Sequence, residues 1–174
     1  MTHSSSFLDA LPSPQRSPEL ADADDLFGWL IGSWDVDAVL HDAKHNIEKR
    51  RGEVHASWVL EGRAIQDLFI FPRRIDRHSG IPTHGDRHAT TLRTYDRTRR
   101  AWRIIFIDPA ADETSAQLLA RRNGDEIVME GNLSDGTPIR WRYDEFTPES
   151  FHYIGEKPKG DSASWQVYLE LFGK

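Results

Sequence analysis

Apolar and polar residues alternate along most of this chain with a period of two, the pattern of β-strands that bury one face. In the stretch 138–146, for example, Ile139, Trp141 and Tyr143 alternate with arginines and an aspartate. Similar stretches recur at short intervals. They predict about ten strands, at 33–41, 47–59, 63–71, 89–95, 101–108, 114–122, 126–131, 138–146, 151–156 and 162–172.

Short turns separate these stretches, which makes consecutive strands neighbours in the sheet. Asn123-Gly124 and Asp135-Gly136 suit tight hairpins, because Gly and Asn accept positive φ at low cost. We find no second helical stretch long enough for a crossover between parallel strands. An open sheet would expose two edges, so we expect an all-β fold, a closed antiparallel up-and-down barrel of about eight to ten strands. A barrel of that size is wide enough to hold a small molecule.

The stretch 26–40 changes period halfway along. Apolar residues first recur at helical spacing up to Ile31, and after Gly32 they alternate strictly from Trp34 onward. The sequence therefore predicts a short helix over 24–31 that leads directly into the first strand. The polar, proline-containing residues 1–21 are expected to form a disordered tail, and residues 22–174 a single domain. The long polar segment 72–88 is either a lid or a flexible loop.

Composition narrows the class of protein. The net charge of −6 gives no reason to expect nucleic acid, and no apolar run approaches the length of a membrane span. We attribute the basic cluster Arg97, Arg99 and Arg100 to a solvated outer face. The chain has no cysteine and no recognisable secretory signal, which favours a cytoplasmic location.

The residues Gly32-Ser33-Trp34, after a short helix and before a meander of strands, resemble the Gly-x-Trp signature of the lipocalin, or calycin, superfamily. The segments "WVLEGRAIQDLF", "TTLRTYD", "AWRIIFIDP", "DGTPIRWRYDEFTPESFHYIGE" and "SWQVYLEL" look like a bacterial family of lipocalin-like proteins of unassigned function, over about residues 24–172. The resemblance implies that Trp34 packs at the closed end of the barrel and that residues 24–31 plug its base. Because the chain lacks disulfides, fatty-acid-binding proteins and nitrobindin-like haem barrels are nearer comparisons than secreted lipocalins.

Aromatic residues on the predicted strands are the candidates for a binding surface. Aromatic walls supply large apolar area and orienting edges, but the same rings can also fill a barrel completely. Both alternatives remain open from the sequence. The predicted ligand-binding residues are Trp58, Gln66, Trp102, Phe106, Trp141, Tyr143 and Tyr153.

A few polar residues could support chemistry. Arg63 and Asp67 share a strand face, and a buried arginine must either be paired or hold an anionic ligand. Asp108 or Tyr143 could act as an acid or a base if it faces an apolar interior. His55 or His152 could ligate haem, while no spacing of residues indicates another metal site.

The sequence thus predicts the binding of a small hydrophobic or amphipathic molecule inside the barrel. The first alternative is an enzyme, a cyclase, isomerase or lyase, that uses Arg63 with a desolvated tyrosine or carboxylate. The second alternative is a haem barrel. A homodimer is also predicted, because several apolar residues are expected on the outer face: Ile105, Ile107, Val128 and Tyr168.

Overall fold

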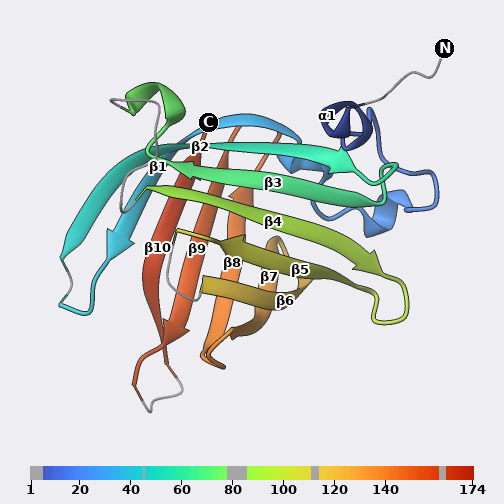
Figure 1. The fold of residues 1–174 in the computed structure, drawn as a ribbon. Coiled ribbons are helices and arrows are strands. Elements are labelled where there is room, and N and C mark those ends of the chain that lie inside the picture. The colour runs from blue at the N-terminus through green and yellow to red at the C-terminus, as the bar shows by residue number, and fades with distance from the viewer. Residues whose placement is uncertain (1–5, 45, 78–85, 111–113, 161–163) are drawn as a thin grey trace.

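The computed structural model describes residues 6–44, 46–77, 86–110, 114–160 and 164–174. Within them the chain forms a closed barrel of ten antiparallel strands, as predicted (Figure 1). The strands are β1 (Gly32–His41), β2 (Ile47–Val59), β3 (Ala64–Phe71), β4 (Arg87–Asp96), β5 (Ala101–Asp108), β6 (Thr114–Asn123), β7 (Glu126–Leu133), β8 (Pro138–Phe146), β9 (Phe151–Pro158) and β10 (Trp165–Gly173).

Each strand pairs with its neighbours in the sequence, and the first strand closes the barrel on the last. In β1 and β10 the register runs from Val36 opposite Gly173 to Leu40 opposite Leu169. On its other side β1 pairs with β2 along its whole length. In the described part of the chain every strand therefore has a neighbour on both sides, whereas an open ten-stranded meander would expose two edge strands.

The alternation places one face of each strand inside the barrel. On β8, Ile139, Trp141 and Tyr143 are buried, while Arg140 and Arg142 are only partly buried on the opposite face. The last strand departs from this regularity, because its register with β9 shifts between Val167 and Leu169. Tyr168 lines the interior together with Leu169 and Leu171. Its predicted place on the outer face was wrong, because strict alternation does not hold across a bulge.

One end of the barrel is closed by the segment before β1. The predicted helix over 24–31 was wrong in type, because the chain forms two short 3-10 turns, η1 (Asp22–Asp24) and η2 (Gly28–Leu30). Side chains three residues apart lie on the same side of a 3-10 turn. Phe27 and Leu30 have this spacing, and both are completely buried. Trp34 Nε1 donates a hydrogen bond of 2.8 Å to the Leu30 carbonyl oxygen, which ties β1 to this plug.

The N-terminal segment also packs against this end of the barrel (Figure 1). It begins with the four-residue helix α1 (Phe7–Ala10). Beyond it, Ser13 N donates to the Trp58 carbonyl oxygen at 2.7 Å, and Ser17 N donates to that of Gly62 at 2.9 Å. Gly62 has φ of +78°, and a Cβ there would lie 2.3 Å from Ser17 N, so glycine is required for this approach. These contacts lie within the stretch 1–21 that was expected to be a tail, whose first five residues lie outside the described part.

The segment 72–88, predicted to be a lid or a flexible loop, is described only in part. Of the segment 72–88, the structure describes a short 3-10 turn, η3 (Arg74–Asp76), and the start of β4. Residues 78–85 lie outside the described residues, and with them most of the predicted lid or flexible loop.

In the described part of the chain, every helix is too short or too polar to cross a membrane.

Candidate ligand-binding cavity

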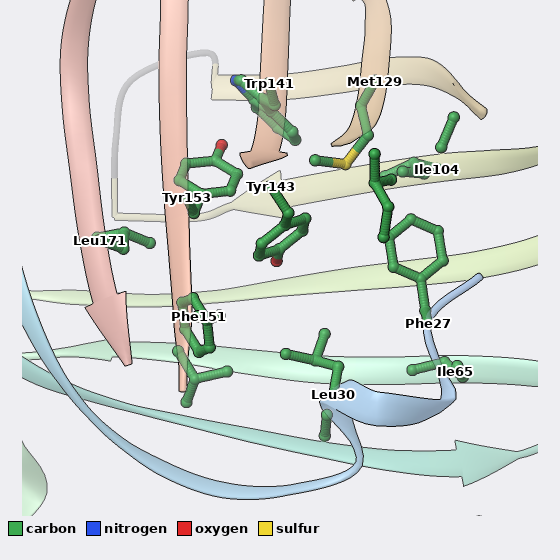
Figure 2. Close-up of a cluster of buried hydrophobic side chains, with 14 of the residues drawn as sticks. Phe27, Leu30, Ile65, Ile104, Met129, Trp141, Tyr143, Phe151, Tyr153 and Leu171 are labelled. Atoms are coloured by element: carbon green, nitrogen blue, oxygen red, sulfur yellow. The ribbon is translucent and has the colours of Figure 1, made fainter. Parts of the chain in front are cut away.

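The interior of the barrel is filled at one end and hollow at the other. Near the plug, Phe27 and Tyr143 pack edge to face with their ring centroids 6.5 Å apart, and Tyr143 meets Phe151 at 5.7 Å. Figure 2 shows Phe27 and Leu30 on the side of the plug, with Trp141 and Met129 on the opposite side of this cluster. Beyond Trp141 and Met129 lies a cavity of about 320 Å³.

The cavity occupies the half of the barrel where β1 ends and β2 begins. Its volume falls at the lower end of the range of small-molecule sites in proteins. Its lining residues come mainly from the strand ends opposite η2: Ala38, Leu40, Arg50, Phe69, Phe71, Arg87, Ala89, Thr91, Arg93, Phe106, Asp108, Met129, Leu133, Thr137, Ile139, Trp141, Tyr153, Lys157, Tyr168, Leu169 and Leu171.

Aromatic side chains form a large part of the cavity wall. Phe106 and Trp141 meet edge to face, with ring centroids 5.4 Å apart, and Trp141 is 6.1 Å from Tyr153. Trp141 Nε1 donates a hydrogen bond of 2.7 Å to the Tyr168 hydroxyl oxygen, which fixes both rings. The wall is therefore apolar over most of its area and held in one arrangement.

A buried ion pair lies at the floor of the cavity. Arg93, on β4, donates from Nη1 to Oδ2 of Asp67 on β3, and their side chains are only 3% and 0% exposed. The Arg93 guanidinium also lies over the Phe27 ring, 5.1 Å from its centroid, between the cavity and the plug. Desolvation raises the pKa of Asp67, and the neighbouring guanidinium opposes this shift. Among the described residues, the buried Nε of Arg93 has no hydrogen-bond partner.

Charged side chains surround the open end. Arg50, Arg87 and Lys157 line it together with one carboxylate, Asp108. Asp108 is almost completely buried and accepts a hydrogen bond from Nη1 of Arg87, whose side chain is 45% exposed. Cations therefore outnumber carboxylates in the lining at this end.

The tyrosines around the cavity are held in the protonated form. Burial raises the pKa of Tyr168 to about 12 and raises the pKa of Tyr153 well above its usual value. Burial also raises the pKa of Tyr143. At neutral pH these hydroxyls can donate hydrogen bonds, but they are poorly suited to accept a proton from a substrate.

The structure separates the predicted ligand-binding residues into two groups. Phe106, Trp141 and Tyr153 line the cavity. Trp58, Trp102 and Tyr143 belong instead to the buried cluster of the barrel, where Trp102 Nε1 donates a hydrogen bond of 2.8 Å to the Asp24 carbonyl oxygen. Gln66 is absent from the lining, and its Nε2 donates to Oγ1 of Thr90 at 3.1 Å.

The predicted chemical residues are also dispersed. Arg63 is half-exposed outside the barrel and pairs with Glu19 and Glu61, so it does not share the inner face with the buried Asp67 as predicted. Arg63 precedes the first residue of β3, and strand alternation therefore does not fix its direction. Asp108 lines the cavity, whereas Asp67 lies behind Arg93.

The two histidines considered for haem lie away from the cavity. His55 Nδ1 is 2.8 Å from Oγ of Ser33, and the His152 ring stacks on Phe172 at 4.5 Å. Within the described residues, no histidine lines the cavity. Neither His55 nor His152 is therefore placed to ligate a haem in this cavity.

Sequence reasoning missed seven polar residues of the cavity, namely Arg50, Arg87, Thr91, Arg93, Thr137, Lys157 and Tyr168. Arg93 is in phase with the buried Ala89 and Thr91 on β4, and Lys157 is in phase with Phe151 and Tyr153 on β9. This period of two could have identified Arg93 and Lys157 as inward-facing residues from the sequence.

The described residues thus form a closed antiparallel barrel with a cavity opposite its plugged end. No protein-family profile and no curated protein matches the chain. Among solved structures, the chain is similar to Rv2717c from M. tuberculosis, with a TM-score of 0.62 and 14% identity over 88% of this chain and 97% of that one. It is also similar to the S-type phycobiliprotein lyase CPES from Guillardia theta, with a TM-score of 0.57 and 10% identity over 88% of this chain and 92% of that one. Both likenesses extend over most of the chain and agree with the ten-stranded antiparallel barrel fold.

Proposed function

We propose that this protein binds a small apolar or amphipathic molecule inside its barrel. The observation that carries the proposal is the cavity of about 320 Å³, which is walled by fixed aromatic rings. A barrel that served only as a stable scaffold would gain by filling this space, because buried voids cost stability. An apolar wall with a few polar groups at its floor and mouth is the usual composition of a ligand site.

The cavity residues favour binding over catalysis. One structural neighbour is described as a lyase, so this barrel architecture is compatible with either role. Here, however, Arg63 of the enzyme alternative lies outside the cavity. The tyrosines around the cavity hold their protons, and the one carboxylate among the described lining residues, Asp108, is engaged by Arg87. These features support recognition of a ligand without a chemical step.

Filling the cavity tests the proposal. Ala89 lines the cavity on β4, and the next residue toward the mouth, His88, is exposed on the opposite face of the strand. We expect Ala89→Phe to reduce the affinity for anilinonaphthalene sulfonate, an amphipathic anionic fluorescent probe, at least about tenfold, because the added ring occupies the binding volume. The matched control His88→Phe should bind as the wild type does. Fluorescence titration gives the dissociation constants, and circular dichroism verifies that both variants are folded.

The same titration can contradict the proposal. If folded Ala89→Phe binds the probe as tightly as His88→Phe does, the probe does not occupy the cavity. Native mass spectrometry of the freshly purified protein should in addition reveal a small molecule carried from the cell by the wild type and absent from Ala89→Phe.

A further inference from the structure

The charges along the cavity are distributed unevenly. Among its described lining residues there are four cations, Arg50, Arg87, Arg93 and Lys157, and one carboxylate, Asp108. The chain as a whole carries a net charge of −6, so this cationic interior runs against the overall balance. A local excess of positive charge indicates that the ligand of the cavity is negatively charged.

The cations differ in how far carboxylates already neutralise them. Arg93 is paired with the buried Asp67, and Arg87 is paired with Asp108. Arg50 Nε lies 2.6 Å from Oε1 of Glu48 on the same strand. Lys157 has no ion pair with any described residue, and its Nζ lies 5.9 Å from the centroid of the Tyr168 ring. Lys157 is therefore the lining cation whose charge remains available.

Lys157 and Arg87 line the same end of the cavity as Tyr168. Both cations are accessible to solvent, since the Arg87 side chain is 45% exposed and Lys157 is also exposed. The Tyr168 hydroxyl also accepts the hydrogen bond from Nε1 of Trp141, which belongs to the aromatic wall of the cavity. The two cations thus stand at the point where the apolar wall meets solvent.

We propose that the bound molecule is an amphipathic anion that enters the cavity with its apolar end first and leaves its charged head at the mouth, beside Lys157 and Arg87. This inference rests on the proposed function and specifies the class of ligand.

The opposite orientation, with the anionic head on Arg93, is disfavoured by the floor of the cavity. A head group there would lose its hydration and would lie near the Asp67 carboxylate, which already neutralises Arg93. At the mouth the head group keeps contact with water and meets a cation that has no carboxylate partner among the described residues. The apolar end is then left against Met129, Leu171 and the aromatic wall.

Three ligands with the same apolar chain test the charge of the head: decanoate, decanol and decylammonium. Isothermal titration calorimetry at neutral pH should give the tightest binding for decanoate, weaker binding for decanol and the weakest for decylammonium. Added salt should weaken the binding of decanoate more than that of decanol, because the head-group contact is exposed to solvent.

A pair of lysine variants tests the position of the head. Lys157→Gln should weaken decanoate binding about fivefold, the effect of losing one solvent-exposed charge contact, and should leave decanol binding unchanged. Lys49→Gln is the matched control, because Lys49 is exposed and precedes the cavity-lining Arg50 on β2, so that its side chain projects from the other face. This variant should bind decanoate as the wild type does.

The outcomes separate the two proposals. If none of the three ligands binds, and no probe is displaced from the cavity, the proposed function fails. If decanoate and decanol bind with equal affinity, or if Lys157→Gln binds decanoate as tightly as Lys49→Gln does, the anionic head at the mouth is overturned while ligand binding stands.

Discussion

Arg93 and Asp67 form the most deeply buried ion pair described in this barrel. Taking two charges out of water is costly, and their attraction repays this cost only when the pair is intact. Their side chains are 3% and 0% exposed, and the Phe27 ring covers one face of the guanidinium. The pair therefore links β3 to β4 at the level where the filled half of the barrel meets the cavity.

Breaking this pair should be strongly destabilising. Asp67→Ala leaves the Arg93 guanidinium buried without its partner, which is expected to lower the free energy of unfolding by about 3–5 kcal/mol. Urea denaturation measures the change. Arg63→Ala is the control, because it removes an exposed pair with Glu19 and Glu61 and should cost far less. Equal losses in the two variants would show that the Arg93–Asp67 pair does not stabilise the fold.

The sequence identified Asp67 as a candidate site residue but did not identify the arginine that pairs with it. The period of two placed Arg63 and Asp67 on one face, whereas the buried arginine beside Asp67 is Arg93. Asp67 lies opposite Thr91 in the register of β3 and β4, which brings Arg93, two residues further along β4, close to it. A register between strands depends on the whole sheet, so one strand read alone could not reveal this partner.

The elements near the plug depend on Trp34. Its ring lies 5.1 Å from that of Phe151 and 6.3 Å from that of Trp29, and its Nε1 donates to the Leu30 carbonyl oxygen. It therefore holds the 3-10 turn η2 against the first and ninth strands. This place agrees with the expectation that Trp34 packs at the closed end.

Removing this side chain should loosen the base of the barrel. Trp34→Ala is expected to cost about 3–5 kcal/mol, as a large-to-small change in a packed core. Thermal and urea unfolding measure the loss. Trp165→Ala offers a comparison of the same chemical change at a partly exposed position, where the ring lies against Arg140, and it should cost much less. An unfolding curve of Trp34→Ala that matches the wild type would show that the plug does not depend on this residue.

Elements with regular alternation were predictable from the sequence. The predicted strands 47–59, 101–108 and 138–146 have the same bounds in the structure. The plug was harder to predict, because a helical spacing of apolar residues fits both an α-helix and two 3-10 turns. Tyr168 was misplaced because a bulge is a property of two paired strands, and the sequence of one strand does not show it.

On the scale of the whole molecule, the sequence predicted a closed wall but could not decide between a filled and a hollow interior. The structure combines the two, since Trp58, Trp102 and Tyr143 belong to the filled core while Phe106, Trp141 and Tyr153 line the cavity. The division depends on the height of each ring along the barrel axis, which follows from strand register and from the plug. Neither could be derived from the count of aromatic residues.

The outer surface carries an apolar feature of its own. Ile105 and Ile107 are both 46% exposed on β5, as expected from the alternation. Tyr168 is no longer part of this surface, because it lines the cavity. The homodimer stays a prediction.

A crystal structure with decanoate brominated at its terminal carbon tests the binding mode most directly, because the anomalous signal of bromine locates the apolar end of the ligand. We predict a bromine peak inside the barrel, near Met129 and Leu171, with the carboxylate close to Lys157. Bromine at the mouth would reverse the proposed orientation. A saturated crystal with no bromine inside the barrel would contradict ligand binding in this cavity.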